Sequence, residues 1–168
     1  MGVDEHRAEA KHGGPVACMV LTVSDRRTAS TDTSGPLIQR LLSEAGHAVA
    51  DTELVPNDPG RIRAALRRFL HGPAQCLVVT GGTGLGRRDI TIETIAPMLE
   101  RTLPGFGELF RTLSYGEIGS AAMLSRAICG TAGGKLVCCL PGSEAAVRLG
   151  VGKLLVPELS HLIWVMRQ

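Results

Sequence analysis

The sequence predicts an α/β fold, and three observations lead to that prediction. Apolar residues make up 44% of the 168-residue chain but aromatic residues only 3%, so the core must consist mainly of Val, Leu, Ile and Ala. Short Val-rich runs, typical of buried strands, alternate with segments of helical periodicity. A chain of this length is most simply one domain, which buries about 70% of its unfolded surface. We expect a mobile tail at residues 1–14 and a single domain at 15–168.

The first predicted strand, residues 16–23, is followed directly by polar residues. Ser24, Asp25 and Arg26 come immediately after its last apolar position. Ligands of open α/β sheets bind at the carboxyl ends of the strands, so these three residues are candidates for substrate contact. The alternative is a structural turn in which Asp25 pairs with Arg26, and the spacing alone does not decide between the two.

A helix and a weaker strand follow this first loop. Ser34 can cap a helix that ends at Gly46. Residues 47–55 are a weaker strand candidate, and residues 60–71 form a basic amphipathic helix whose arginines we interpret as a solvated face.

The turn between that strand and that helix contains Asn57 and Asp58. Asn, Asp and Pro all favour turns, so a plain turn is one interpretation. The functional interpretation is that an acid here converges with Asp89 from a neighbouring strand end.

A glycine-rich loop follows the apolar run 77–79. Four glycines fall within six residues, and two arginines and an acid come next: Gly81, Gly82, Gly84, Gly86, Arg87, Arg88 and Asp89. Glycines let backbone N–H groups approach a phosphate, and a helix that begins near Thr91 adds positive potential. The arginines offer forked donors to phosphate oxygens, and Asp89 is a suitable ligand for magnesium. This pattern predicts a site for a magnesium-bound phosphorylated ligand.

Two common phosphate-binding loops are excluded at this position. A Walker A loop ends in Gly-Lys-Ser/Thr, whereas Gly86 precedes Arg87 here. The dinucleotide fingerprint requires a glycine three residues after Gly84, and that position is also Arg87. A glycine-rich turn without a ligand is the remaining alternative.

The second half of the chain predicts further helices and one more strand. Pro97 should end a short helix and begin an irregular element to about Thr102. We expect a helix with Leu109, Phe110 and Leu113 facing inward, and another helical stretch over 119–129.

Residues 135–140 are predicted to form a further buried strand. It ends at Pro141 and Gly142, after which Ser143 can cap a helix to about residue 149. A last apolar helix is expected over 153–166.

Composition excludes several classes of protein. A net charge of +2 is far below the basic excess of a nucleic-acid-binding protein, and no apolar run reaches the ~20 residues that span a membrane. The polar amino-terminal region lacks the apolar core of a signal peptide. Five cysteines without a Cys-x-x-Cys pair indicate reduced, buried thiols, and the five histidines show no zinc-ligand spacing. We expect a cytoplasmic protein with neither a nucleic-acid nor a membrane partner.

Five motifs in order resemble the MoaB/Mog family of molybdenum-cofactor biosynthesis proteins. The resemblance covers almost everything from residue 16 onward, and its motifs are Thr22–Arg26 with Asp32–Gly35, Thr80–Gly84 with Arg88 and Asp89, Pro104–Glu108, Leu124–Arg126, and Leu140–Ser143.

This resemblance implies a three-layer α/β/α sandwich with a mixed sheet around a parallel core, and a homotrimer or homohexamer. It also implies molybdopterin adenylyltransferase activity, in which AMP is transferred from Mg-ATP to the terminal phosphate of molybdopterin and pyrophosphate is released. Asp89 matches the essential acid of the family. The matched motifs imply that the phosphates and the pterin are bound by Ser24, Asp25, Arg26, Gly81, Gly82, Thr83, Gly84, Arg87, Arg88, Ser125, Arg126, Pro141, Gly142 and Ser143.

One position departs from the family pattern. Family members thought to be active usually have an acid directly after the proline that matches Pro56, and this chain has Asn57 there. A neutral amide oxygen binds magnesium more weakly than a carboxylate, so Asp58 is the alternative metal ligand beside Asp89. The departure leaves a non-catalytic molybdopterin carrier or scaffold open as a second function. A third alternative, an unrelated nucleotide-binding regulator, rests only on the glycine loop.

Overall fold

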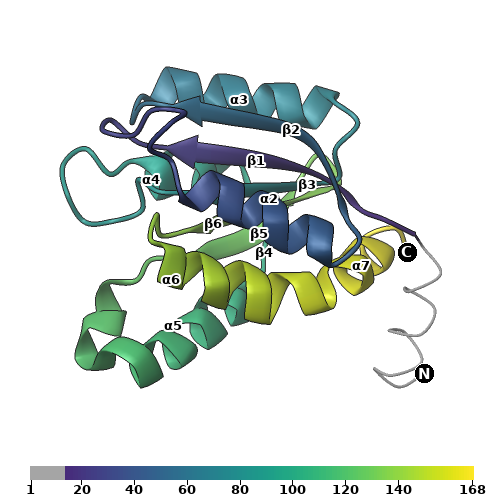
Figure 1. The fold of residues 1–168 in the computed structure, drawn as a ribbon. Helices are drawn as coiled ribbons and strands as arrows, with labels where there is room; N and C mark the ends of the chain where they lie inside the picture. Colours follow the sequence, from purple (N-terminus) through teal and green to yellow (C-terminus); the bar gives the residue numbers. More distant parts are fainter. Residues whose placement is uncertain (1–13) are drawn as a thin grey trace.

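A six-stranded mixed sheet forms the centre of the structure, a computed structural model that describes residues 14–168 (Figure 1). The strand order is β2-β1-β3-β6-β5-β4. The first four of these neighbours are parallel, β5 is antiparallel to β6, and β4 is antiparallel to β5. The strands are β1 (Ala17–Val23), β2 (Ala48–Val55), β3 (Cys76–Thr80), β4 (Arg101–Thr102), β5 (Ile128–Ala132) and β6 (Lys135–Leu140). The predicted tail lies outside the described residues except for Gly14.

Helices cover both faces of this sheet and complete the predicted three layers. One face carries α3 (Pro59–His71) and α4 (Thr91–Ile95), which continues as a 3₁₀ turn, Ala96–Met98. The other face carries α2 (Ser34–Glu44), α5 (Pro104–Ile118) with a 3₁₀ segment, Gly119–Leu124, and then α6 (Glu144–Val147), a π-helical segment, Arg148–Leu155, and α7 (Val156–Val165).

Alternation along the buried strands produces two separate cores. Successive side chains of a strand point to opposite faces, so Val20 packs under α2 while Leu21 packs under α3. Residues such as Val78 and Val79 divide in the same way between the two layers. The low aromatic content is accommodated because aliphatic side chains fill both interfaces.

All five cysteines belong to the described part of the chain and are buried free thiols, as expected. Burial raises the pKa of Cys139 and of Cys138 well above the ordinary value. These thiols therefore remain protonated and act as small apolar side chains.

The strand register brings four loops to one edge of the sheet. Val23 pairs with Val55, and Thr80 pairs with both Thr22 and Leu140, so the four parallel strands end at nearly the same level. The segments that follow β1, β2, β3 and β6 therefore meet at the carboxyl edge, on the left of Figure 1. The described residues contain no helix of the length and apolarity that crossing a bilayer requires.

Several expected elements differ from the structure in the second half of the chain. The predicted helix over 119–129 is wrong: Gly119 has φ +60° and ends α5, and β5 follows the short 3₁₀ segment. Strand β4 was not predicted. Leu109 is 55% exposed rather than inward, whereas Phe110 is buried as expected. The two helices expected over 143–166 form one continuous series of turns.

Two expected helix caps also differ. Ser34 is the first residue of α2, and the Asp32 carboxylate accepts hydrogen bonds from the N–H groups of Ser34 (3.0 Å) and Gly35 (3.2 Å). Thr91 is the first residue of α4 rather than its cap. In both cases the hydroxyl instead donates to a loop carbonyl of the candidate site.

Candidate active site

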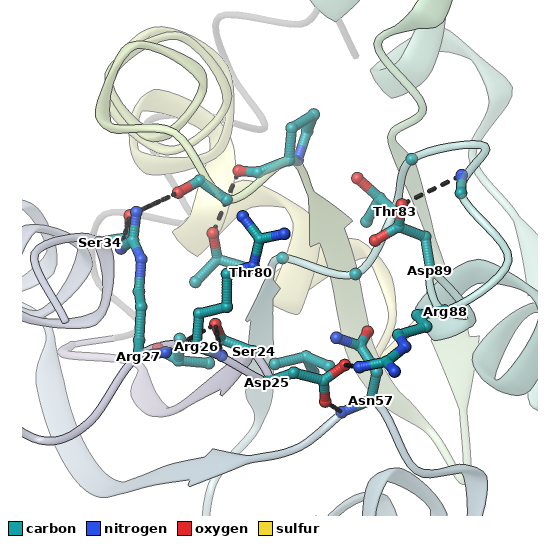
Figure 2. Close-up of a pocket in the computed structure, with 18 of the residues that line it drawn as sticks. Ser24, Asp25, Arg26, Arg27, Ser34, Asn57, Thr80, Thr83, Arg88 and Asp89 are labelled. Atoms are coloured by element: carbon teal, nitrogen blue, oxygen red, sulfur yellow. Dashed lines mark hydrogen bonds and ion pairs between the residues drawn. The ribbon is translucent and has the colours of Figure 1, made fainter. Parts of the chain in front are cut away.

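A cavity of about 930 Å³ opens at the carboxyl edge of the sheet (Figure 2). Its walls come from the loops after β1, β2, β3 and β6, and from Leu124 and Ser125. The strand register explains why loops from four distant parts of the sequence enclose one space.

The glycine loop forms the floor of this cavity and requires its glycines. Gly81 has φ +93°, and a Cβ there would lie 2.3 Å from the carbonyl oxygen of Val23. Gly82 has φ +63°. Thr91 fixes the loop to α4, because its hydroxyl donates to the Gly81 carbonyl (2.8 Å) and its N–H to the Gly82 carbonyl (2.9 Å). Only residues without a Cβ allow the backbone to pass so close to the end of β1.

Asp89 lies against the second half of the same loop. Its Oδ2 accepts a hydrogen bond from the N–H of Gly86 (3.2 Å) and would lie 2.6 Å from a Cβ at Gly84. The carboxylate therefore lies against the loop backbone, and Asp89 lines the cavity, where its charge suits a bound cation.

Asn57 and Asp58 have different positions although they are adjacent. Asn57 lines the cavity, and its Oδ1 is buried without a hydrogen-bond partner, beside Gly82. The Asn57 N–H donates to Asp25 (2.8 Å). Asp58 caps α3 by accepting from the N–H of Arg61 (2.7 Å) and does not line the cavity. The amide oxygen of Asn57 is thus the group at this turn that has no hydrogen-bond partner in the protein, and it lies against Gly82 rather than open to solvent.

Charged side chains give the cavity a positive surplus. Four arginines and two aspartates line it. Arg88 is 87% exposed and lies 3.8 Å from Asp25, a separation at which an exposed ion pair contributes little. An anionic ligand would therefore meet more positive than negative charge, as a polyphosphate requires.

Arg27 and Ser34 also line the cavity, although the sequence did not single them out as site residues. Arg27 donates through Nη1 to Ser34 Oγ (2.8 Å) and through Nη2 to the carbonyl of Gly142 (3.1 Å). The sequence held a signal for each residue, since Arg27 adjoins three candidates in the first loop and Ser34 belongs to the matched motif Asp32–Gly35.

Comparison with known proteins decides the family. The sequence pattern of a family described as a probable molybdopterin binding domain matches residues 19–161. The chain belongs to this family.

Relatives of the family cover nearly the whole chain. Molybdenum cofactor biosynthesis protein B of Bacillus cereus is 47% identical over 100% of this chain and 99% of its own length. The protein of the same name from Bacillus subtilis is 45% identical over the same shares.

Solved structures agree with this membership. A crystal structure of a molybdenum cofactor biosynthesis protein B is 48% identical, with a TM-score of 0.89 over 92% of this chain and 98% of that one. The tungsten cofactor synthesizing protein MoaB from Pyrococcus furiosus is 37% identical, with a TM-score of 0.83 over the same shares. The chain thus shares the molybdopterin-binding fold and belongs with molybdenum cofactor biosynthesis.

In this molybdopterin-binding domain, the structure brings most of the predicted site residues together. The residues that line the cavity are Ser24, Asp25, Arg26, Asn57, Gly81, Gly82, Thr83, Gly84, Arg87, Arg88, Asp89, Ser125, Pro141 and Gly142. Asp58, Arg126 and Ser143 do not line it. The individual roles of all these residues stay predictions.

Arg126 and Ser143 hold backbone segments of the domain instead of lining the cavity. Arg126 donates to the Gly84 carbonyl (3.0 Å) and pairs with Glu93. Burial opposes ionisation of Glu93, but the hydrogen bond and charge of Arg126 together with a backbone hydrogen bond outweigh burial, and the pKa of Glu93 lies below its usual value. Ser143 caps α6 by accepting from the N–H of Ala146 (3.2 Å).

Proposed function

We propose that this chain catalyses the Mg-ATP-dependent adenylylation of molybdopterin. The observation that carries the proposal is that two side-chain oxygens lie against the glycine loop. The carboxylate of Asp89 lies beside Gly84 and Gly86, and the unpartnered amide oxygen of Asn57 lies beside Gly82. Arginines surround both in one cavity. Such an arrangement fits a metal-bound triphosphate beside a second phosphorylated ligand.

The residues present fit magnesium. Mg²⁺ usually takes one or two protein ligands and completes its shell with waters and substrate phosphates. Within residues 14–168, no group of three or more His, Cys, Asp or Glu side chains could hold a metal alone, so a substrate would have to supply further ligands. Asp89 and the Asn57 oxygen would hold the ion, whereas Asp58 would have to leave its helix cap. When bound, magnesium would neutralise charge on the reacting phosphates.

The reaction needs alignment more than acid–base chemistry. An oxygen of the terminal phosphate of molybdopterin attacks the α-phosphorus of ATP, the bond to the bridging oxygen breaks, and pyrophosphate leaves with the electron pair. The attacking oxygen is already ionised, so no strong general base is required. Glycine N–H groups and Arg26, Arg87 and Arg88 would orient and neutralise the two phosphorylated substrates.

We further propose a homotrimer or homohexamer in the cytoplasm. ATP as a substrate and five reduced thiols suit that compartment. Five exposed large apolar side chains belong to α5 and the 3₁₀ segment after it, which supports an interface there: Leu109, Tyr115, Ile118, Met123 and Leu124.

A non-catalytic molybdopterin carrier is the second candidate, and one observation favours it. The amide of Asn57 provides a weaker magnesium ligand than a carboxylate. Under this alternative the cavity would bind molybdopterin tightly and release no pyrophosphate.

One assay distinguishes the two candidates. Protein, molybdopterin, ATP and magnesium are mixed, and adenylylated pterin and pyrophosphate are followed over time. We expect product, and we expect Asp89→Asn to lower turnover roughly 100-fold or more while the thermal midpoint stays near that of wild type. Near-normal turnover by that variant would falsify the role of Asp89. Binding of pterin without product by the wild type would favour the carrier.

A further inference from the structure

We propose that Arg27 is a positioning residue that holds the Pro141–Gly142 turn against the glycine loop. It would thereby set the distance between the two walls of the cavity. The kinetic part of this inference rests on the proposed adenylyl transfer, whereas the structural part stands without it.

The guanidinium of Arg27 contacts three groups, one in the first loop, one at the start of α2 and one in the turn after β6. Figure 2 shows Arg27 beside Ser34. Nη1 donates to Asp32 Oδ1 (3.1 Å) and to Ser34 Oγ (2.8 Å), and Nη2 donates to the Gly142 carbonyl (3.1 Å). Ser34 Oγ donates to the same carbonyl (2.8 Å). Two donors from the first loop and from α2 therefore hold one carbonyl that lies more than 100 residues later in the chain.

Asp32 provides a fixed negative charge behind this arginine. Its carboxylate accepts from the Thr22 hydroxyl (2.7 Å) as well as from Arg27 and two N–H groups, and its side chain is 8% exposed. Burial raises the pKa of Asp32, but these hydrogen bonds outweigh burial and leave the pKa below the ordinary value. The carboxylate is therefore ionised at neutral pH and fixes the direction of the Arg27 fork.

Contacts beyond Gly142 connect the turn to the glycine loop. A Cβ at Gly142 would lie 3.1 Å from the Cα of Gly81, so the two backbones touch. The Thr80 hydroxyl donates to the Pro141 carbonyl (3.1 Å), and the Gly81 N–H donates to Leu140 (3.0 Å). A shift of the turn would therefore displace the start of the phosphate-binding loop.

Arg27 differs from Arg88 of the same cavity in how far its side-chain donors are engaged by the protein. Its side chain is 30% exposed and its fork is engaged by protein acceptors, whereas Arg88 is almost fully exposed. Lysine cannot replace such a fork, since one ammonium group does not reproduce the planar arrangement of donors. The structure assigns Arg27 to the protein side of the cavity wall rather than to the substrate.

Hydrogen exchange on the ligand-free, full-length chain tests the structural part. We expect Arg27→Met and Arg27→Lys to speed exchange in segments 140–147 and 80–84. Asp32→Asn should affect the same segments, because it removes the charge that orients Arg27. Arg40→Met is the control, since Arg40 is exposed on α2 and lies 3.8 Å from Glu44 in a surface pair. Unchanged exchange in both segments for Arg27→Lys and Arg27→Met would overturn the proposal.

Steady-state kinetics test the functional part. A misplaced phosphate wall should lower kcat by roughly 100-fold in Arg27→Met, with partial rescue in Arg27→Lys. The KM for ATP should change less than about threefold, because the donors of Arg27 are engaged by protein acceptors although its side chain lines the cavity. Arg26→Met should instead raise KM. A raised KM with unchanged kcat in Arg27→Met would make Arg27 a substrate contact and contradict the proposal. If the wild type forms no product, the proposed function fails and hydrogen exchange alone decides the role of Arg27.

Discussion

At the scale of single residues, the buried amide oxygen of Asn57 is unusual because it has no hydrogen-bond partner. A buried oxygen without a hydrogen-bond partner costs roughly 1–3 kcal/mol. In this site it lies beside Gly82 of the glycine loop, whereas the carboxylate of the adjacent Asp58 already has a partner. If the amide turned toward the cavity, a bound cation would satisfy the oxygen and relieve this cost.

Asn57→Asp tests that interpretation. The contact of a charged side-chain oxygen is stronger than that of a neutral one by about 1 kcal/mol. The magnesium concentration at half-maximal velocity should therefore fall roughly fivefold in this variant. Titration of velocity against magnesium measures this shift. Asp58→Asn is the matched control, because asparagine caps helices as well as aspartate does. If Asp58→Asn abolished turnover while Asn57→Asp had no effect, Asp58 would be the metal ligand instead.

The sequence predicted that this turn belongs to the site, and it also held a signal that separates the two residues of the turn. Asn57 and Asp58 both carry an oxygen, and which one faces the cavity depends on where α3 begins. Capping by Asp58 was readable from the pattern of Asp58 followed by Pro59 at the helix start. Contacts such as Arg27 to Gly142 could not be predicted, because they depend on how closely two distant loops approach.

At the scale of elements, the end of β3 is the most constrained part of the site. Gly81 combines a positive φ with a close approach to the Val23 carbonyl, whereas Gly46 has a similar φ of +83° and open space around its Cβ position. These two glycines separate the cost of the backbone conformation from the cost of the collision.

We expect Gly81→Ala to destabilise the protein more than Gly46→Ala does. Both substitutions should lower the free energy of unfolding by about 1–2 kcal/mol, because alanine is disfavoured in the left-handed conformation. The collision at Gly81 should add roughly 1–3 kcal/mol. Urea denaturation of both variants measures the difference. Equal midpoints would mean that β1 and the glycine loop separate more easily than their contact indicates.

The wrongly predicted helix over 119–129 has a local physical reason. Its sequence contains Ala and Leu residues that favour helix, but the strand character of β5 comes from pairing with β6. A signal was present in Gly133 and Gly134, which both have positive φ and join two apolar runs as a two-residue hairpin turn does. Strand β4 has only two residues, which is too short for an alternating pattern of apolar and polar residues to be recognised.

At the scale of the whole molecule, the exposed apolar side chains of α5 and the following segment call for a partner surface. We expect sedimentation to give three or six times the 17.7 kDa mass of one chain. The double substitution Ile118→Asp and Met123→Asp should shift the protein toward the monomer with its far-UV circular dichroism retained. Val165→Asp is the control, since Val165 is exposed on another element, α7. A wild type that sediments only as a monomer at micromolar concentration would contradict the assembly.

The position of β6 in the sheet has a consequence for synthesis on the ribosome. Although β6 is the last strand of the chain, it lies between β3 and β5 in the sheet. Until it emerges, β3 exposes a fully buried strand as an unpaired edge, which is a hazard for association with other chains. The cavity also lacks one wall until that moment. A nascent chain that stops before residue 141 therefore lacks the part of the cavity wall that Pro141 and Gly142 form.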